Sequence, residues 1–292
     1  MQKGKKVIAF IPGDKFPAIS ITDYSCDLMC DFCRGKYLRG MVSVRRPEEL
    51  YNVAREIWEK GGIGLLVSGG FDKYGKLPVK PYLGVLERIK KDFELIISIH
   101  PGFLELEMIK ELKKCKVDVI DYEFAFDPTL LKYMHLNLEP NNVVKHFREC
   151  LKVGFGQVVP HILLGLNGHI SEWNYRALEV LSPFDISLIV LLVFIPTRGT
   201  PLEFSDPPPV REIVNYVNWA SNALQRTEIA LGCMRPISYK DSLDEILVKN
   251  GFISRIANPH KRLIKKYSLP MINACCSIPL DYFNGITLKR NH

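Results

Sequence analysis

The sequence lacks several features that would place it in large classes of protein. Its most hydrophobic stretch, residues 186–195, is about ten residues long, half of what a membrane-spanning helix needs. The amino-terminal segment, residues 1–6, has no apolar targeting core, and the chain carries no internal repeat or low-complexity segment. We therefore expect a protein of the reducing cytoplasm that has no membrane partner.

The chain also lacks the pattern of a broad basic surface. Its formal net charge is +7, with the main concentration late in the sequence, at Arg255, His260, Lys261, Arg262, Lys265 and Lys266. A nucleic-acid-binding protein typically has a wider basic face with interleaved aromatic residues, so we expect no nucleic acid partner. We interpret the late basic segment as a solvated helix face, with docking of an acidic partner protein as the alternative.

Three of the eight cysteines lie close together, directly after the strand-like run 18–22. Cys26, Cys30 and Cys33 fall within eight residues. Structural zinc would need a fourth ligand, commonly from a second close pair with a short spacer, and no such pair is present. A disulfide framework is not expected in a chain of this length without a signal peptide.

The spacing of the three cysteines favours an iron–sulfur cluster, because three thiolates from one loop can converge on one metal centre. Three ligands for four irons leave one iron without a protein ligand, and an open coordination position indicates catalysis. Asp27 and Asp31 lie beside the cysteines. Acidic neighbours of this kind argue against three cysteines buried by chance in a core.

Along the rest of the chain, short apolar runs alternate with amphipathic stretches. The expected strands are 18–22, 64–68, 95–100, 117–124, 157–166 and 186–196, and the helices between them are near 47–60, 83–90, 105–114, 142–151 and 173–181. Such alternation predicts an α/β fold with a parallel sheet and helical crossovers. A helix at 210–225 and a seventh strand at 228–232 follow. We expect residues 1–206 to form the core barrel and residues 207–292 a carboxy-terminal extension that closes its mouth within the same compact unit.

The cysteine motif, with Phe32 just before the last cysteine, resembles the radical S-adenosylmethionine (SAM) superfamily, and the resemblance makes Phe32 a candidate contact for SAM. The resemblance implies a partial (β/α)6 barrel, which the carboxy-terminal strands could extend towards a TIM-like barrel. It also implies that SAM chelates the open iron of a 4Fe-4S cluster. One electron from that cluster then cleaves SAM to methionine and a 5′-deoxyadenosyl radical.

Residues that directly follow the strands are candidates for the same site, because ligands of parallel sheets bind at the carboxyl ends of the strands. Ser68, Gly69 and Gly70 end the second expected strand, and a glycine pair lets a ligand approach the backbone closely. The segment resembles the Gly-Gly-Glu element that binds the methionine end of SAM, with Phe71 in place of the acidic residue. We expect Gly70→Ala to weaken SAM binding and to leave the cluster intact.

Other strand ends supply further candidate ligands. His100 and Glu123 end the third and fourth strands and could bond the ribose or amino group of SAM, or the substrate. Thr197 and Gly199 follow the sixth strand, where a rigid proline-flanked turn suits a platform for a flat base. This segment resembles the Pro-x-x-Gly-Thr-Pro element of biotin synthase.

Three later cysteines are candidate ligands of an auxiliary iron–sulfur cluster. Cys233 follows the seventh strand, and Cys275 and Cys276 are adjacent in the carboxy-terminal extension. The alternative interpretation is that they are small core residues.

Several short segments, among them 16–22 and 232–236, resemble the biotin-synthase-like radical SAM group, and within it the archaeal-type two-component lipoyl synthases. The resemblance implies insertion of sulfur into an octanoyl chain on a lipoyl domain or octanoyl-lysine peptide, with the auxiliary cluster as sulfur donor. It also implies a second synthase component and an electron donor such as ferredoxin. Two alternatives remain: a radical SAM methylase or rearrangement enzyme, and a non-catalytic iron–sulfur electron carrier.

Overall fold

The computed structural model describes residues 6–283, which form two compact units. The continuous unit comprises residues 12–159. The split unit combines the described residues up to Ile11 with those from Pro160 onward. The expected boundary between residues 206 and 207 therefore falls inside the split unit, because strands that follow it pair with strands that precede it.

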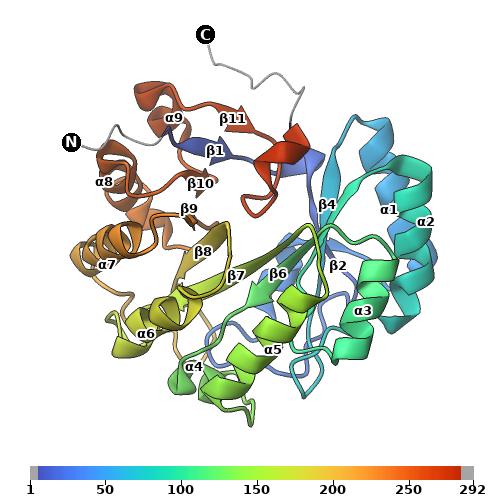
Figure 1. Ribbon diagram of the computed structural model, residues 1–292, viewed down its shortest axis with the longest axis horizontal. Coiled ribbons are helices and arrows are strands. Elements are labelled where there is room, and N and C mark those ends of the chain that lie inside the picture. Colours follow the sequence, from blue (N-terminus) through green and yellow to red (C-terminus); the bar gives the residue numbers. More distant parts are fainter. Residues whose placement is uncertain (1–5, 284–292) are drawn as a thin grey trace. The chain divides into compact units, whose positions relative to one another are not determined.

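The continuous unit is a parallel sheet whose strands are connected by helices (Figure 1). Its strand order is β3-β2-β4-β5-β6. The strands are β2 (Ala18–Ser20), β3 (Val42–Ser43), β4 (Gly64–Ser68), β5 (Ile96–Ile99) and β6 (Val119–Glu123). The helices are α1 (Pro47–Glu59), α2 (Leu83–Phe93), α3 (Leu106–Lys114), α4 (Pro128–Tyr133) and α5 (Pro140–Lys152).

Helix α1 shows why these segments are helical. It begins with Pro47, whose fixed φ suits the first turn, and two glutamates follow where the helix dipole favours negative charge. Leu50, Ala54 and Ile57 form its buried stripe at helical spacing. The stripe packs on the sheet and orients the strand ends that carry the candidate site.

The split unit is also a parallel sheet, with the order β11-β1-β10-β9-β8-β7. Its strands are β1 (Ile8–Phe10), β7 (Gln157–Leu164, which begins in the continuous unit), β8 (Leu188–Val193), β9 (Glu228–Leu231), β10 (Arg255–Ala257) and β11 (Met271–Ile272). The helices are α6 (Glu172–Leu181), α7 (Val210–Ala223), α8 (Leu243–Asn250) and α9 (Lys261–Tyr267). In Figure 1, α7, α8 and α9 flank the strands β9, β10 and β11.

The predicted fold class, α/β with parallel strands joined by helical crossovers, is confirmed within each unit. Each strand and helix expected between residues 18 and 232 is present, with ends shifted by a few residues. Strands β1, β3, β10 and β11 and helices α4 and α8 were not expected, whereas α9 falls in the late basic segment that was interpreted as a helix face. Among the described residues, none of the helices is long and apolar enough to cross a membrane. The expected absence of a targeting core falls mostly on residues 1–5, which lie outside the described part.

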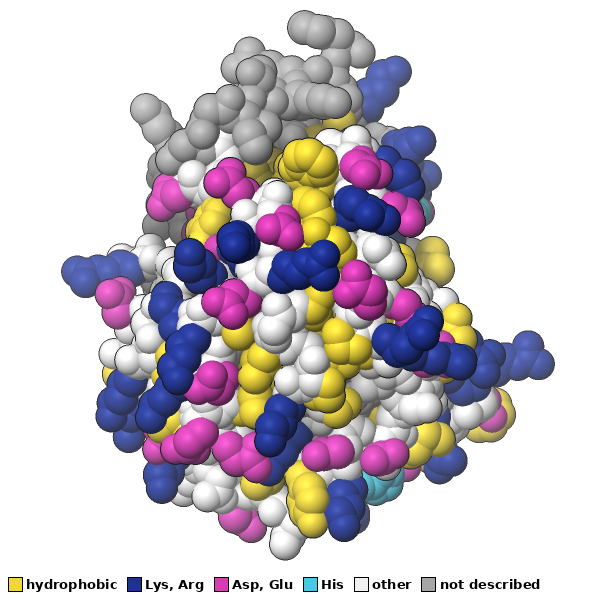
Figure 2. Space-filling view, turned by 90° about the vertical axis from the view of Figure 1, so that its right-hand side faces the viewer, with side chains coloured by type: hydrophobic (Ala, Val, Ile, Leu, Met, Phe, Trp, Pro, Cys, Tyr) yellow, Lys and Arg dark blue, Asp and Glu magenta, His cyan; other side chains and the backbone are white. Residues whose placement is uncertain are grey.

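The side of the molecule on which α1 and α2 lie in Figure 1 carries charges of both signs. Figure 2 shows acidic and basic side chains interspersed over this face. Arg88 pairs with Glu48 and with Asp92 and lies over the ring of Tyr51. Such mixed charge is typical of a solvated helix face and does not form a basic surface for nucleic acid.

Candidate functional site

The cysteine loop follows β2 and is closed by its own backbone. The amides of Cys33 and Arg34 donate to the carbonyl of Cys30 at 3.1 and 2.9 Å. Cys30 is buried, whereas Cys26 and Cys33 are half-buried. One loop of the continuous unit therefore carries all three predicted cluster ligands.

Two of the thiols interact directly, and this changes their acidity in opposite directions. The hydrogen bond from the Cys30 thiol, with a further one from the backbone of Gly35, lowers the pKa of Cys33 to about 7. The same contact with Cys33, together with burial, raises the pKa of Cys30. The thiolate is the form that binds metal, so Cys33 is close to its ligand form near neutral pH.

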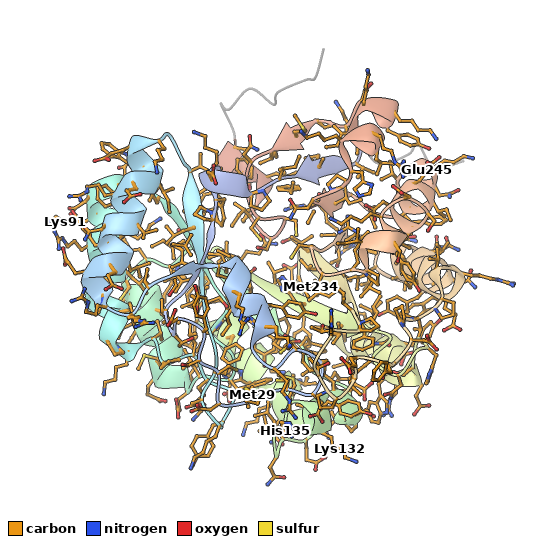
Figure 3. All side chains as sticks on the ribbon, turned by 180° about the vertical axis from the view of Figure 1, so that it is seen from behind. Met29, Lys91, Lys132, His135, Met234 and Glu245 are labelled. Carbon is orange, nitrogen blue, oxygen red and sulfur yellow. The ribbon has the colours of Figure 1, made fainter. Side chains whose placement is uncertain are left out.

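The last residue of α4 and the segment after it hold the middle of the cysteine loop. The Asp31 amide donates to the carbonyl of Tyr133 at 2.9 Å, and His135 Nε2 lies 3.3 Å from Asp31 Oδ1. Figure 3 shows Met29, Lys132 and His135 close together on this side of the continuous unit. The loop is therefore anchored between two of its cysteines.

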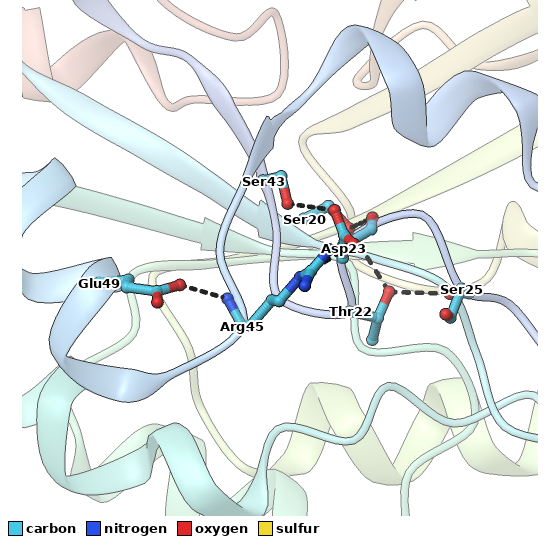
Figure 4. A network of polar contacts seen from close by, with 7 residues as sticks. All are labelled: Ser20, Thr22, Asp23, Ser25, Ser43, Arg45 and Glu49. Carbon is cyan, nitrogen blue, oxygen red and sulfur yellow. Dashed lines mark hydrogen bonds and ion pairs between the residues drawn. The ribbon is translucent and has the colours of Figure 1, made fainter.

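A polar network holds the start of the loop (Figure 4). Asp23 has a φ of +55° and accepts hydrogen bonds from Ser43 and from Arg45. Its backbone carbonyl accepts a bond from the Ser20 hydroxyl at 2.6 Å. The Ser43 hydroxyl, and after it Arg45, hold the pKa of Asp23 below its usual value. Glu49 extends the network by accepting from the Arg45 amide at 2.7 Å.

The glycine turn after β4 packs directly on the cysteine loop. A Cβ placed at Gly70 would lie 1.9 Å from the carbonyl oxygen of Ser25 and 2.6 Å from Cys26 Cα. The Gly70 amide donates to Thr22 Oγ1 at 2.6 Å. Our expectation that Gly70→Ala would leave the cluster intact is therefore wrong, because the added methyl group collides with the cluster loop. Binding of SAM at Gly69 and Gly70 stays a prediction.

Phe71 connects the cysteine loop with the next strand end. Its amide lies 3.4 Å from Cys26 Sγ, and its ring meets His100 edge-on, with 5.2 Å between the ring centroids. His100 Nε2 lies 3.8 Å from Glu123 Oε2. Burial, and after it the charge of Cys33, raises the pKa of Glu123 to about 7. The structure therefore brings the glycine turn, His100 and Glu123 together around the cysteine loop.

The hydroxyl of Ser98 indicates that this region is built for a polar ligand. Ser98 is fully buried in β5, two residues before His100, and its Oγ has no hydrogen-bond partner among the described residues. A buried hydroxyl without a partner costs free energy, and a polar ligand placed against it would remove that cost. Ser68 is also buried, level with Ser20 of β2. The proposed contact of Phe32 with SAM stays a prediction; its side chain is half-buried.

Two of the predicted ligands belong to the split unit, in the turn after β8. The Thr197 hydroxyl donates to the carbonyl of Ile195 at 3.0 Å, and the Gly199 amide donates to the Glu203 carboxylate. Gly199 has a φ of +71°, which a residue with a side chain rarely adopts. The turn is thus a defined platform, and its contact with SAM stays a prediction.

Cys233 lies in a turn held by a fully buried ion pair. The Arg235 guanidinium donates to both carboxylate oxygens of Asp244 at 2.7 Å, and to the carbonyl of Gly232 at 2.6 Å. Both side chains of the pair are 0% exposed, whereas Cys233 is exposed. Burial raises the pKa of Asp244, against the opposing effect of Arg235. The Arg235–Asp244 pair therefore fixes the turn that carries the exposed Cys233.

A second buried arginine holds the other cysteine turn. Arg255 donates to the carbonyls of Cys276 and Ile278 at 2.9 and 2.7 Å. Cys275 Sγ accepts from the Ser277 hydroxyl at 3.2 Å. Cys276 is only 4% exposed, so its thiol is less accessible to a cluster than those of Cys233 and Cys275. The role of all three as auxiliary ligands stays a prediction.

The late basic residues are largely neutralised within the split unit. Four of the six pair with acidic side chains: Arg255 with Glu228, His260 and Arg262 with Asp241, and Lys266 with Glu245. This pairing favours a solvated helix face over a surface dedicated to an acidic partner for the residues of and beside α9. For Arg255 the expectation is wrong, because this residue is buried in β10.

The donor set of the cysteine loop fits a four-iron cluster. Within residues 6–283, no three His, Cys, Asp or Glu side chains converge on a point that could hold a single metal ion. A tetrahedral zinc site requires such a point. A four-iron cluster does not, because its thiolates bind separate irons. Thr22, Asp23 and Ser98 were not predicted from the sequence. Thr22 ends the expected strand 18–22 and Asp23 directly follows it, so both stand where ligand-binding residues are expected.

Comparison with known proteins agrees with this donor set. Residues 21–176, more than half of the chain, match the family model of the radical SAM superfamily. A tRNA-2-methylthio-N(6)-dimethylallyladenosine synthase of Clostridioides difficile (strain 630) is 25% identical over 77% of this chain and 49% of its own length. The same enzyme of Lachnoclostridium phytofermentans is 20% identical over 82% of this chain and 54% of its own length. The chain thus spans about half the length of these relatives.

Solved structures share the fold at low sequence identity. Methylornithine synthase (PylB) superposes with a TM-score of 0.63 at 20% identity, covering 87% of this chain and 72% of that one. The [FeFe]-hydrogenase maturase HydG gives 0.68 at 14% identity, covering 98% and 68%. SuiB of Streptococcus suis, bound to SAM, gives 0.59 at 12% identity, covering 82% and 53%.

Proposed function

This chain belongs to the radical SAM superfamily, and we propose that it inserts sulfur into an octanoyl chain carried on a lipoyl domain. It is a radical SAM enzyme whose cofactors are a 4Fe-4S cluster and SAM. When bound, these supply a 5′-deoxyadenosyl radical that can remove hydrogen from an unactivated carbon, which no acid or base of the protein can do. The protein's part is to bind, orient and exclude side reactions.

The continuous unit would perform the first half of the reaction. Cys26, Cys30 and Cys33 hold the cluster, with one sulfur within reach of the Phe71 amide. His100 and Glu123 lie where the polar part of SAM or substrate would be held. Near neutral pH Glu123 is partly protonated, so its carboxyl can donate as well as accept a hydrogen bond.

The single observation that carries the sulfur-insertion proposal is the exposed thiol of Cys233 on the turn fixed by Arg235 and Asp244. Such a thiol suits a ligand of an auxiliary sulfur-donating cluster, together with Cys275. The relatives named for a methylthio group on tRNA adenosine support sulfur insertion as the reaction class. The late basic segment is paired internally and the face in Figure 2 has mixed charge, so neither offers tRNA a basic surface.

A second candidate is a radical SAM enzyme of the same group that methylates or rearranges its substrate. The burial of Cys276 favours it, because a buried thiol leaves fewer ligands for an auxiliary cluster. We further propose a reducing, cytoplasmic setting, a second synthase component, and an electron donor such as ferredoxin.

Anaerobic reconstitution separates these candidates. With a reductant and SAM, we expect thiolated product from an octanoyl-lysyl peptide or lipoyl domain and none from tRNA carrying dimethylallyladenosine, measured by mass spectrometry. Changing Cys26, Cys30 and Cys33 together to Ala should abolish 5′-deoxyadenosine formation. Cys233→Ala should keep SAM cleavage but lose iron and sulfur insertion.

Cys115→Ala is the matched control, since Cys115 lies in the continuous unit outside every predicted site. Normal sulfur transfer by the Cys233→Ala variant would contradict the proposal. So would thiolation of tRNA in place of the octanoyl substrate.

A further inference from the structure

The Thr22 hydroxyl joins two segments that are far apart in the sequence. It accepts a hydrogen bond from the Gly70 amide at 2.6 Å and donates one to the carbonyl of Ser25 at 3.0 Å. One side chain thus links the glycine turn after β4 to the residue that directly precedes Cys26. Thr22 also has the Ser20 hydroxyl 3.4 Å away.

Backbone atoms fill the space between the glycine turn and the cysteine loop. The missing Cβ of Gly70 would overlap the carbonyl of Ser25, so the backbones are in direct contact. The Asp27 amide donates to the carbonyl of Phe71 at 2.8 Å, and the Phe71 amide points back to Cys26 Sγ at 3.4 Å. The turn and the loop therefore run side by side, and the position of the Phe71 amide depends on where the Gly70 amide is held.

We propose that Thr22 is a positioning residue for the cluster. Its hydroxyl fixes the Gly70 amide and, through it, keeps the Phe71 amide on the sulfur of Cys26. This inference rests on the cluster that the superfamily carries, and not on the octanoyl substrate proposed above.

The consequence is electrostatic. A hydrogen bond to a cluster sulfur stabilises the more negative, reduced state, and such bonds are among the determinants of cluster potential. Without the Thr22 hydroxyl the Gly70 amide loses its acceptor, the Phe71 amide can shift away from Cys26, and reduction of the cluster becomes harder. A role in general stability alone would not change the potential.

The test compares Thr22→Val, which removes the hydroxyl at nearly constant size, with Thr22→Ser, which keeps it. In cluster-free protein, we expect the Gly70 amide of the Val variant to exchange with solvent roughly two- to tenfold faster, as for loss of one hydrogen bond. After reconstitution, an EPR-monitored titration should give a more negative midpoint potential for the Val variant. Thr22→Ser should match the unmodified protein in both measurements.

Thr227→Val is the matched control. The buried Thr227 hydroxyl also donates to a backbone carbonyl, that of Ile186 at 3.0 Å, but in the split unit. It should lower overall stability without changing Gly70 exchange or the midpoint potential. Unchanged exchange and unchanged potential in Thr22→Val would overturn the proposal. If Thr22→Val does not load its cluster, the exchange measurement on cluster-free protein decides alone.

Discussion

Asp244→Asn removes the charge of one partner of the buried ion pair while keeping the shape of the side chain. The carboxylate accepts two of the three hydrogen bonds made by Arg235. Neither side chain is exposed, so water cannot solvate the charge that remains on Arg235. Leaving one buried charge without its partner costs about 3–5 kcal/mol. Against a total stability of about 5–15 kcal/mol, this is between about a fifth and the whole of what a typical protein has.

The loss can be measured by urea denaturation of the cluster-free protein, followed by circular dichroism. Asp241→Asn is the matched control, because its pairs with Arg262 and His260 are exposed to solvent and should contribute little to stability. The double change Arg235→Met with Asp244→Leu should cost less than Asp244→Asn, since it leaves no buried charge. Equal losses in Asp244→Asn and Asp241→Asn would refute this reasoning.

Two further predictions concern the glycine turn and the cysteines. Gly70→Ala should reduce the iron content per chain after reconstitution, because its Cβ would displace the cluster loop. Gly84→Ala, at a helix position with open space around it, should bind iron normally, and full iron content in both variants would contradict the predicted collision. Burial raises the pKa of Cys150 to about 12, so at pH 8 iodoacetamide should label Cys233 and not Cys150, as read by mass spectrometry. The unfolded Cys150 thiol loses its proton near pH 9, whereas the folded thiol keeps its proton up to about pH 12. The stability that Cys150 contributes is therefore present below pH 9 and is lost as the pH rises towards 12. A Cys150→Ala variant that loses as much stability over this pH range as the unmodified protein would contradict this.

The parts of the fold that could be predicted are the long ones. Strands and helices such as α1 and β4 contain enough residues to show a period, and the alternation between them predicts a parallel α/β sheet. Strands β10 and β11 are three and two residues long, shorter than any periodic pattern. Their existence depends on pairing with β1, which the sequence around them does not reveal.

The same distinction applies to the site. The three cluster cysteines can be recognised in the sequence because they lie within eight residues and all carry a thiol that binds metal. The contact between Thr22 and Gly70 joins residues 48 positions apart, and a threonine after a strand has many ordinary uses. The glycine pair predicted close approach of a ligand, which stays a prediction, whereas the structure shows that the backbone of Ser25 lies against Gly70.

Strand β1 is synthesised early, but the two strands with which it pairs are synthesised late. Residues 8–10 pair on one side with β10 and on the other with β11, more than 240 positions later. A nascent chain can complete the continuous unit long before either partner exists. Strand β1 must then wait until residues up to Ile272 have been synthesised, with its apolar residues Ala9 and Phe10 not yet covered. Contacts over such separations form slowly, so insertion of β1 is expected among the last steps of folding.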